Sequence, residues 1–266
     1  MIDTSQAFWL ALVQGVTEFL PISSSGHLIL LPYFLDWPDQ GLAFDVAVHV
    51  GTLLGVLFYL REDIKKITLD LVWFVIQGKR GEGSKLGILI LLATVPAVIT
   101  VLVIDASVWS KMRHPVVIGV TTVGFALVLL ISDIFGSKKR KIQDLGWRDA
   151  FVIGIAQAIA LIPGTSRAGI TMTAALMMGA DRRSSAKFSF LLSIPVIFAA
   201  GIQQGFSLIE NTTTIDWQVF ITGLVVSGIS AWLVIKIFIR WLTRIGMLPF
   251  VVYRVILGIL ILMWIY

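Results

Sequence analysis

Cysteine is absent from this chain of 266 residues. Disulfide bonds, thiolate metal sites and a cysteine nucleophile are therefore excluded. Two further patterns are missing, because no segment has the Gly-Lys-Ser/Thr order of a nucleotide P-loop and no HExxH zinc motif occurs. The three histidines, His27, His49 and His114, are scattered and show no metal-ligand spacing. Chemistry is left to hydroxyl, carboxylate, imidazole and guanidinium groups.

Charged residues are also scarce. They make up 14% of the sequence and hydrophobic residues 57%, against about 25% and roughly 45–50% in an ordinary soluble domain. Apolar runs of about 20 residues, the length that crosses the hydrocarbon layer, recur along the whole chain. The stretch from Met1 to Thr4 lacks the basic region of a cleavable signal peptide, so we expect the first apolar segment to be retained. The sequence predicts a single integral membrane domain, residues 1–266.

The apolar segments are of two kinds. Six are uninterrupted and long enough to span a bilayer, namely 43–60, 86–104, 115–135, 188–206, 218–239 and 248–266. Two others, 7–35 and 149–179, are each split by a proline and small polar residues. Their arms are too short to span, and this favours re-entrant helix–loop–helix hairpins. The predicted fold is an all-α polytopic membrane protein with six full transmembrane helices and two re-entrant hairpins.

The basic residues indicate the orientation, because cytoplasmic loops of membrane proteins carry an excess of Lys and Arg. If each hairpin returns to its own side, 17 of the 21 basic residues lie on one face, in loops 61–85, 136–149, 180–187 and 236–247. Both termini are then expected outside the cytoplasm. The net charge of +5 thus reflects topology, and no nucleic-acid partner is expected.

Both broken segments belong to an internal repeat. The offset is 143 residues up to the glutamine and 142 beyond it, and it relates Ala7-Phe8, Gln14, Pro21 and Ser24 to Ala150-Phe151, Gln157, Pro163 and Ser166. Three predicted spans separate the hairpins, so the second repeat, about 149–266, should be inverted relative to the first, about 1–135. Inverted repeats with broken helices commonly place a binding site at their interface near the midplane. The two hairpins are therefore expected to form one site.

The first hairpin offers an acid, hydroxyls and an imidazole. Gln14 and Glu18 are four residues apart, on one face of the inbound helix. Pro21 ends that helix, and the start of the next one is an anion site. The residues we assign to that start are Ser23, Ser24, Ser25, Gly26 and His27. An ionisable group inside the membrane costs roughly 2.5–3.5 kcal/mol on insertion scales, so Glu18 requires a partner, a cavity or a function.

The second hairpin contributes a permanent cation. Arg167 has a planar guanidinium suited to phosphate oxygens, and it stands beside another predicted helix start. The neighbours we assign to substrate binding are Gly164, Thr165, Ser166 and Thr171. Together the two hairpins supply hydroxyl nucleophiles, a carboxylate, an acid or base and an anion clamp. This set of groups suits phosphoryl transfer or hydrolysis.

Structural roles compete with this interpretation. A Glu18–Arg167 ion pair could simply tie the hairpins together. Serines are common at close helix contacts in membranes, and His27 could be a satisfied core histidine.

Three other ionisable residues are weaker candidates. Asp45 and His49, four residues apart, either extend the polar site or bond each other near the membrane edge. For Arg254, in the last predicted span, snorkelling or pairing with a carboxylate is favoured over catalysis.

Residues 14–27 and 163–167 resemble the two signature regions of bacterial undecaprenyl-pyrophosphate phosphatases, also called bacitracin-resistance proteins. That family's first motif is Glu or Gln, three residues, then Glu, which Gln14 and Glu18 match. Its second motif is Pro-Gly-x-Ser-Arg-Ser-x-x-Thr, where Ala168 replaces the second serine. The Ser-Phe-Leu-Leu-Ser-Ile-Pro stretch at 189–195 extends the similarity over essentially the whole chain.

The resemblance implies hydrolysis of undecaprenyl diphosphate to undecaprenyl phosphate and inorganic phosphate, dependent on Mg²⁺ or Ca²⁺. It places the protein in the bacterial inner membrane, with the active site open to the periplasmic side, where the charge count also puts both termini. The implied roles are recycling of the cell-wall lipid carrier and bacitracin resistance. A homodimer is compatible with the sequence.

If the chain has this activity, Ser24 is the candidate nucleophile, and Arg167 stabilises the charge that develops on the terminal phosphate. His27 either assists proton transfer or is itself the nucleophile. Glu18, with Gln14, holds the divalent cation or activates a hydroxyl.

Two other functions compete with hydrolysis of the prenyl diphosphate. An inverted-repeat transporter or lipid flippase shares the expected architecture and stays open as an alternative. A phosphatase of the phosphatidic-acid type needs a histidine six residues after its arginine and an aspartate ten after it. This chain has Thr173 and Met177 at those positions, so the second rival fails.

Overall fold

The computed structural model of the protein describes residues 2–79, 81–105, 108, 112, 114–210 and 215–265. Its helices are α1 (Thr4–Thr17), α2 (Ser24–Phe34), α3 (Gly41–Tyr59), α4 (Arg61–Gln77), α5 (Glu82–Val103), α7 (Pro115–Phe135), η1 (Ile142–Asp144), α8 (Trp147–Ile159), α9 (Arg167–Met177), α10 (Arg182–Glu210), α11 (Trp217–Ile245) and α12 (Leu248–Ile265). Over these ranges the chain forms no strand, which confirms the prediction of an all-α fold.

Five helices are long and apolar enough to cross a membrane, namely α3, α5, α7, α10 and α11. They match five of the six predicted spans and make the chain a multi-pass membrane protein. The sixth predicted span forms α12, which is apolar but shorter, so its crossing stays a prediction. Helices α10 and α11 have 29 residues each and exceed the predicted 188–206 and 218–239. The extra residues include Arg182 and Arg183 at the start of α10 and Arg240 and Arg244 at the end of α11, so each helix extends past its apolar stretch.

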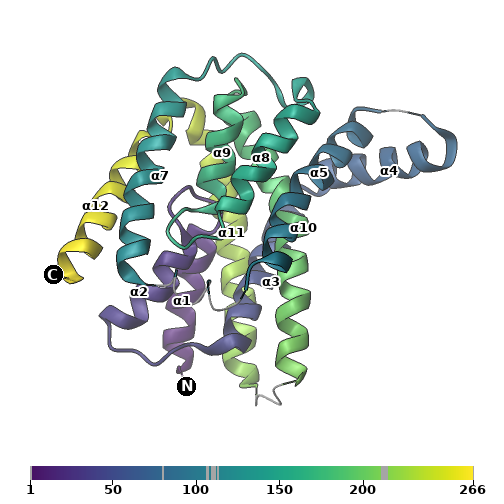
Figure 1. The fold of residues 1–266 in the computed structure, drawn as a ribbon. Helices are drawn as coiled ribbons and strands as arrows, with labels where there is room; N and C mark the ends of the chain where they lie inside the picture. The colour runs from purple at the N-terminus through teal and green to yellow at the C-terminus, as the bar shows by residue number, and fades with distance from the viewer. Residues whose placement is uncertain are drawn as a thin grey trace.

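The segment 61–85 differs from the expected loop. Most of it is helix α4, which has 17 residues with none buried, and it projects from the body with the start of α5 (Figure 1). Glu62 and Asp63 in its first turn favour the helix start, where the backbone dipole is positive. Gly78 ends the helix with a left-handed φ of 68°. The sequence indicated only a short surface helix at 67–77 on this basic face, and the structure extends it to Arg61–Gln77.

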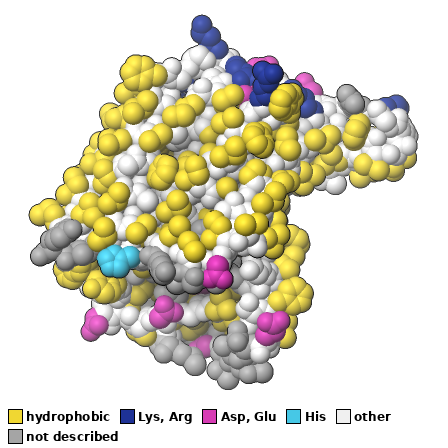
Figure 2. Space-filling view, in the orientation of Figure 1, with side chains coloured by type: hydrophobic (Ala, Val, Ile, Leu, Met, Phe, Trp, Pro, Cys, Tyr) yellow, Lys and Arg dark blue, Asp and Glu magenta, His cyan; other side chains and the backbone are white. Residues whose placement is uncertain are grey.

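Lys and Arg side chains gather at the upper end of the molecule and at the tip of the α4–α5 projection (Figure 2). Acidic side chains are scattered over the lower half of the same face (Figure 2). The N-terminus lies at the bottom and the C-terminus at the lower left, away from the upper basic end (Figure 1). This arrangement agrees with the charge count along the sequence.

The helices of the two hairpins start at a constant offset. Helices α2 and α9 both start and end 143 residues apart, and α1 and α8 begin at the same offset. This offset pairs Ser23 with Ser166 and Ser24 with Arg167, so the sequence alignment of Ser24 with Ser166 was wrong by one residue. The reason is conformational, because Ser23 and Ser166 are the residues with φ values of 71° and 68° before each helix.

Each hairpin packs on the opposite half of the chain. Helix α1 lies against α11, and α8 lies against α5. Glycine allows both close contacts, since a Cβ at Gly15 would lie 2.6 Å from the carbonyl oxygen of Ser227, and one at Gly154 2.8 Å from that of Ala93. Such contacts bring the hairpin turns to the middle of the bundle, from below for α1–α2 and from above for α8–α9 (Figure 1).

Both arms of the second hairpin are fastened at its basic end. The Arg140 guanidinium donates to Asp149 over 2.9 and 2.7 Å and to the carbonyl oxygen of Met178 over 2.7 Å. The hydrogen bonds to Asp149 raise the pKa of Arg140 above its ordinary value. Because Asp149 lies in the first turn of α8 and Met178 directly follows α9, Arg140 joins the two ends of this hairpin.

Candidate active site

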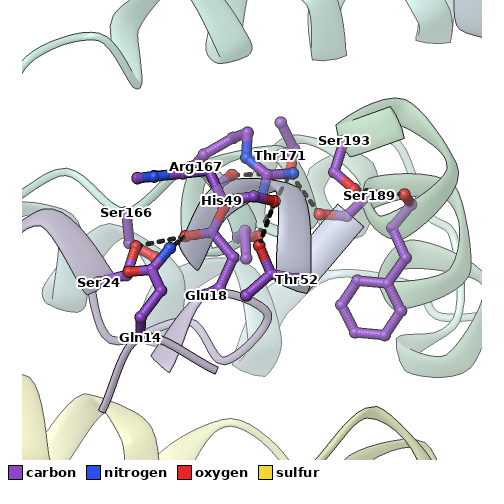
Figure 3. Close-up of polar contacts among 12 residues, drawn as sticks. Gln14, Glu18, Ser24, His49, Thr52, Ser166, Arg167, Thr171, Ser189 and Ser193 are labelled. Carbon is purple, nitrogen blue, oxygen red and sulfur yellow. Dashed lines mark hydrogen bonds and ion pairs between the residues drawn. The ribbon is translucent and has the colours of Figure 1, made fainter. Parts of the chain in front are cut away.

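Glu18 stands at the centre of a polar cluster formed by both hairpins (Figure 3). Its Oε2 accepts hydrogen bonds from Gln14 Nε2 at 2.9 Å and from the Ser24 hydroxyl at 2.6 Å. Its Oε1 accepts from Arg167 Nη2 at 2.6 Å, and the Glu18 side chain is only 7% exposed. The structure therefore brings together four of the predicted residues, including the ion pair named as the structural alternative.

The site lies where two helices begin. Ser24 is the first residue of α2 and Arg167 the first of α9. The residues before them, Ser23 and Ser166, have φ values of 71° and 68°, a region that costs a non-glycine residue of order 1–3 kcal/mol and that clusters at functional sites. The strained residues Ser23 and Ser166 therefore mark the point where each turn ends and its helix begins.

The two helix starts are not equivalent. Ser166 caps α9, because its hydroxyl accepts a hydrogen bond from the Gly169 amide at 3.1 Å. Ser23 makes no such side-chain cap for α2. The first amides of an uncapped helix point outwards with the positive end of the helix dipole. The start of α2, which carries Ser24, is thus the better site for an anion.

Two buried polar atoms in the cluster have no hydrogen-bond partner in the described part of the chain. They are Gln14 Oε1, an acceptor, and Arg167 Nη1, a donor. Buried groups of this kind normally find partners, so both atoms are available to a bound ligand or to water. The donor suits a phosphate oxygen, and the acceptor beside a carboxylate suits a hard cation.

Glu18 and Gln14 also offer oxygen ligands to a divalent cation. Among the described residues, no group of three or more His, Cys, Asp and Glu side chains forms a metal cage. Mg²⁺ is commonly held by one or two protein oxygens, with the remaining ligands from substrate phosphates and water. Glu18 and the free Oε1 of Gln14 fit this smaller protein share.

His27 is held away from Ser24. Its Nδ1 lies 2.7 Å from the carbonyl oxygen of Ser23, and its Nε2 lies 2.5 Å from the hydroxyl of Tyr253 on α12. The two rings are stacked with centroids 5.7 Å apart. Since a carbonyl only accepts, Nδ1 carries the proton and Nε2 accepts from Tyr253. In this arrangement the Ser24 hydroxyl donates to Glu18, and His27 is bonded to other partners.

Asp45 and His49, the weaker candidates, are in contact only through the main chain of Asp45. His49 Nδ1 lies 2.7 Å from the main-chain oxygen of Asp45, so the bond does not involve the carboxylate. The Asp45 carboxylate accepts from Gln40 Nε2 at 3.1 Å. His49 lies beside the Glu18–Arg167 pair (Figure 3). Of the two candidates, His49 is the one that extends the polar cluster.

The other predicted binding residues surround the two turns. The Thr171 hydroxyl donates to the carbonyl oxygen of Arg167 at 2.8 Å and lies 2.7 Å from the Ser189 hydroxyl, so it ties α9 to α10. Ser25 is exposed, with its hydroxyl 3.4 Å from that of Ser23, and Gly26 is buried in the first turn of α2.

Arg254 was misjudged from the sequence. It neither snorkels nor pairs with a carboxylate in the described part of the chain, but is fully buried. Its guanidinium donates to main-chain oxygens of both turns, at 3.4 Å to Pro21 and at 2.9 Å to both Gly164 and Thr165. The available signal was an arginine inside an apolar span, which is itself a reason to expect a functional position.

A polar site at the junction of two broken helices, inside an apolar helical body, defines a multi-pass membrane protein that handles an anion. The family described as "Bacitracin resistance protein BacA" matches residues 7–260, and the chain belongs to this family. A protein of Alcanivorax borkumensis named undecaprenyl-diphosphatase is 51% identical over 99% of both chains. Its namesake from Chromohalobacter salexigens is 49% identical over 96% of this chain and 97% of its own.

Proposed function

We propose that this protein hydrolyses undecaprenyl diphosphate to undecaprenyl phosphate and inorganic phosphate. The observation that carries the proposal is the hydrogen bond of 2.6 Å from the Ser24 hydroxyl to Glu18, whose other oxygen is paired with Arg167. Family membership and the names of the relatives supply the lipid. The reaction recycles the lipid carrier of cell-wall synthesis and lowers sensitivity to bacitracin.

Substrate binding begins at Arg167. The free Nη1 donates to an oxygen of the terminal phosphate, and further phosphate oxygens replace Glu18 on Nη2. The uncapped amides at the start of α2 bind the same group. Glu18 is then released from its ion pair and becomes a stronger base. Glu18 is thus paired with Arg167 before the substrate binds and acts as the base after it has bound.

In the first chemical step, Ser24 Oγ attacks the terminal phosphorus and its proton passes to Glu18 Oε2. The bond from phosphorus to the bridging oxygen breaks, and its electron pair leaves with undecaprenyl phosphate. Arg167 and the α2 amides stabilise the charge on the phosphoryl oxygens. Water then cleaves the phosphoserine, Glu18 returns the proton to Ser24, and the protons of the water remain with the released phosphate.

A divalent cation, Mg²⁺ or Ca²⁺, is part of the proposal. Gln14 Oε1 and Glu18 Oε1 would hold it together with substrate oxygens, while Glu18 Oε2 stays in contact with the Ser24 hydroxyl. When bound, it neutralises negative charge on the diphosphate. Nothing in this mechanism requires a second copy of the chain.

The proposed orientation follows from the charge distribution. The chain crosses the inner membrane six times, α12 included, and α1–α2 and α8–α9 are re-entrant hairpins of two inverted repeats. The basic upper end faces the cytoplasm and both termini face the periplasm (Figures 1 and 2). The site opens to the periplasmic side, where the substrate diphosphate is exposed.

Phosphate release from detergent-purified protein tests the function. With undecaprenyl diphosphate as substrate, we expect phosphate release that a chelator abolishes and that added Mg²⁺ or Ca²⁺ restores. A transporter or flippase would release no phosphate in detergent, where no sealed membrane exists. Absence of release from folded protein contradicts the hydrolysis, and release that persists in the chelator contradicts the cation requirement alone.

A further inference from the structure

Arg254 touches the two catalytic turns at once. Its Nη2 donates to the carbonyl oxygens of Gly164 and Thr165, both at 2.9 Å. These residues immediately precede Ser166 and Arg167 in the second turn. Its Nη1 donates over 3.4 Å to the carbonyl oxygen of Pro21, at the start of the first turn. One side chain from the last helix therefore links both hairpins.

The burial of this guanidinium is unusual. Arg254 is 0% exposed, and its Nε has no hydrogen-bond partner within the described residues. A buried charge is costly unless other groups compensate it, and within the described residues the guanidinium of Arg254 donates to main-chain carbonyls. A neutral side chain could fill the same volume at lower cost. The charge and the planar fork allow contacts at both turns that a neutral side chain could not make.

The turns need an external constraint. Ser23 and Ser166 adopt positive φ values, and such residues persist only where the surrounding structure holds them in place. The neighbouring residue on α12, Tyr253, holds the His27 ring by stacking and by a hydrogen bond of 2.5 Å. Tyr253 and Arg254 of α12 thus contact the segments 21–27 and 164–165, which lie next to Ser24 and Arg167.

We propose that Arg254 is a positioning residue that sets the two catalytic turns against each other. By bridging Pro21 to Gly164 and Thr165, it holds Ser24 and Arg167 on opposite sides of Glu18. The inference rests on the proposed hydrolysis for its kinetic readout. Its structural readout, the local order of the turns, does not depend on any activity.

The first test removes the bridge. In Arg254→Met, hydrogen exchange of the amides in segments 20–27 and 163–170 should become faster, while the exchange of α4 stays the same. Per folded molecule, kcat should fall about 100-fold and KM should change less than threefold, because the misplaced turns weaken the transition state more than lipid binding. The matched control is Arg240→Met, an exposed residue of α11, which should match the wild type in both measurements.

The second test displaces the guanidinium without removing it. A Cβ at Gly169 would lie 2.9 Å from Arg254 Nη1, the flexible end of that side chain. Alanine also suits a helix better than glycine, so Gly169→Ala should stay folded. Its kcat should fall about tenfold in the wild-type background, and it should cause no further loss in Arg254→Met.

The outcomes separate the two proposals. Wild-type protein without phosphate release contradicts the proposed function, and the exchange measurement then decides the bridge alone. Unchanged exchange in both segments of Arg254→Met overturns the bridge, whatever the activity. An equal effect of Gly169→Ala in both backgrounds also overturns it, because that substitution would then act on Ser166 and not through Arg254. If Arg254→Met does not fold, the exchange of the two segments in Gly169→Ala decides, and unchanged exchange contradicts the bridge.

Discussion

Replacing Glu18 by glutamine is expected to lower phosphate release by roughly 10²–10⁴-fold, the usual contribution of general acid–base catalysis. Glutamine has nearly the same shape and can still accept the hydrogen bond from Ser24, which is 2.6 Å long in the structure. It cannot take up the proton of the hydroxyl. The measurement is kcat per folded molecule, at several concentrations of Mg²⁺, since the cation requirement should shift as well.

The control for Glu18→Gln is Glu62→Gln, at an exposed position of α4. It should leave both kcat and the cation requirement unchanged. If Glu18 is only a structural tie to Arg167, the Glu18→Gln protein will instead be less stable while each folded molecule turns over normally. That outcome would contradict the catalytic role of the carboxylate.

Replacing Arg167 by lysine is expected to reduce kcat by about 10²–10³-fold, the size of effect seen when one donor to a developing charge is removed. Lysine keeps the charge but loses the planar fork. A single ammonium group cannot place one donor at the position of Nη2 and a second at the position of Nη1. Folding should be preserved, because Lys can still pair with Glu18. Turnover and thermal unfolding of the purified protein measure the two effects.

A suitable control is Arg148→Lys, in the first turn of α8 of the same hairpin. Arg148 is exposed, stacks on Trp147 at 5.2 Å, and is distant in sequence from the turn. The substitution should change turnover less than twofold. Near-normal turnover in Arg167→Lys would contradict the anion clamp.

Much of the architecture was predictable because it follows from local patterns. Apolar length gave the spans, and Pro21 and Pro163 with their polar neighbours gave the broken segments. Helical spacing placed Gln14 and Glu18 on one face, and the structure joins them at 2.9 Å. The repeat indicated that the hairpins meet, as the Glu18–Arg167 contact shows.

The contacts of α12 were not predictable in the same way. Arg254 reaches Pro21 across 233 residues of sequence, and Tyr253 reaches His27 across 226. Periodicity describes which face of a helix is apolar, but it does not say which distant turn that face meets. The proton-transfer role considered for His27 relied on its spacing from Ser24, and this spacing takes no account of Tyr253.

The pairing of the repeats shows a similar limit. Ser24 was aligned with Ser166 because the side chains are the same, whereas the backbone pairs Ser23 with Ser166. The two serines at positive φ mark equivalent points of two turns, and the residues after them differ because one is the candidate nucleophile and the other the cation. Equivalent backbone positions thus carry different side chains in the two hairpins.

The most direct test of the central claim is to identify the phosphorylated residue. The protein would be mixed with undecaprenyl diphosphate labelled in its terminal phosphate, quenched rapidly, and digested to peptides. We predict acid-stable label on Ser24 and no label in Ser24→Ala. Acid-labile label on the imidazole nitrogen of His27 would contradict the account.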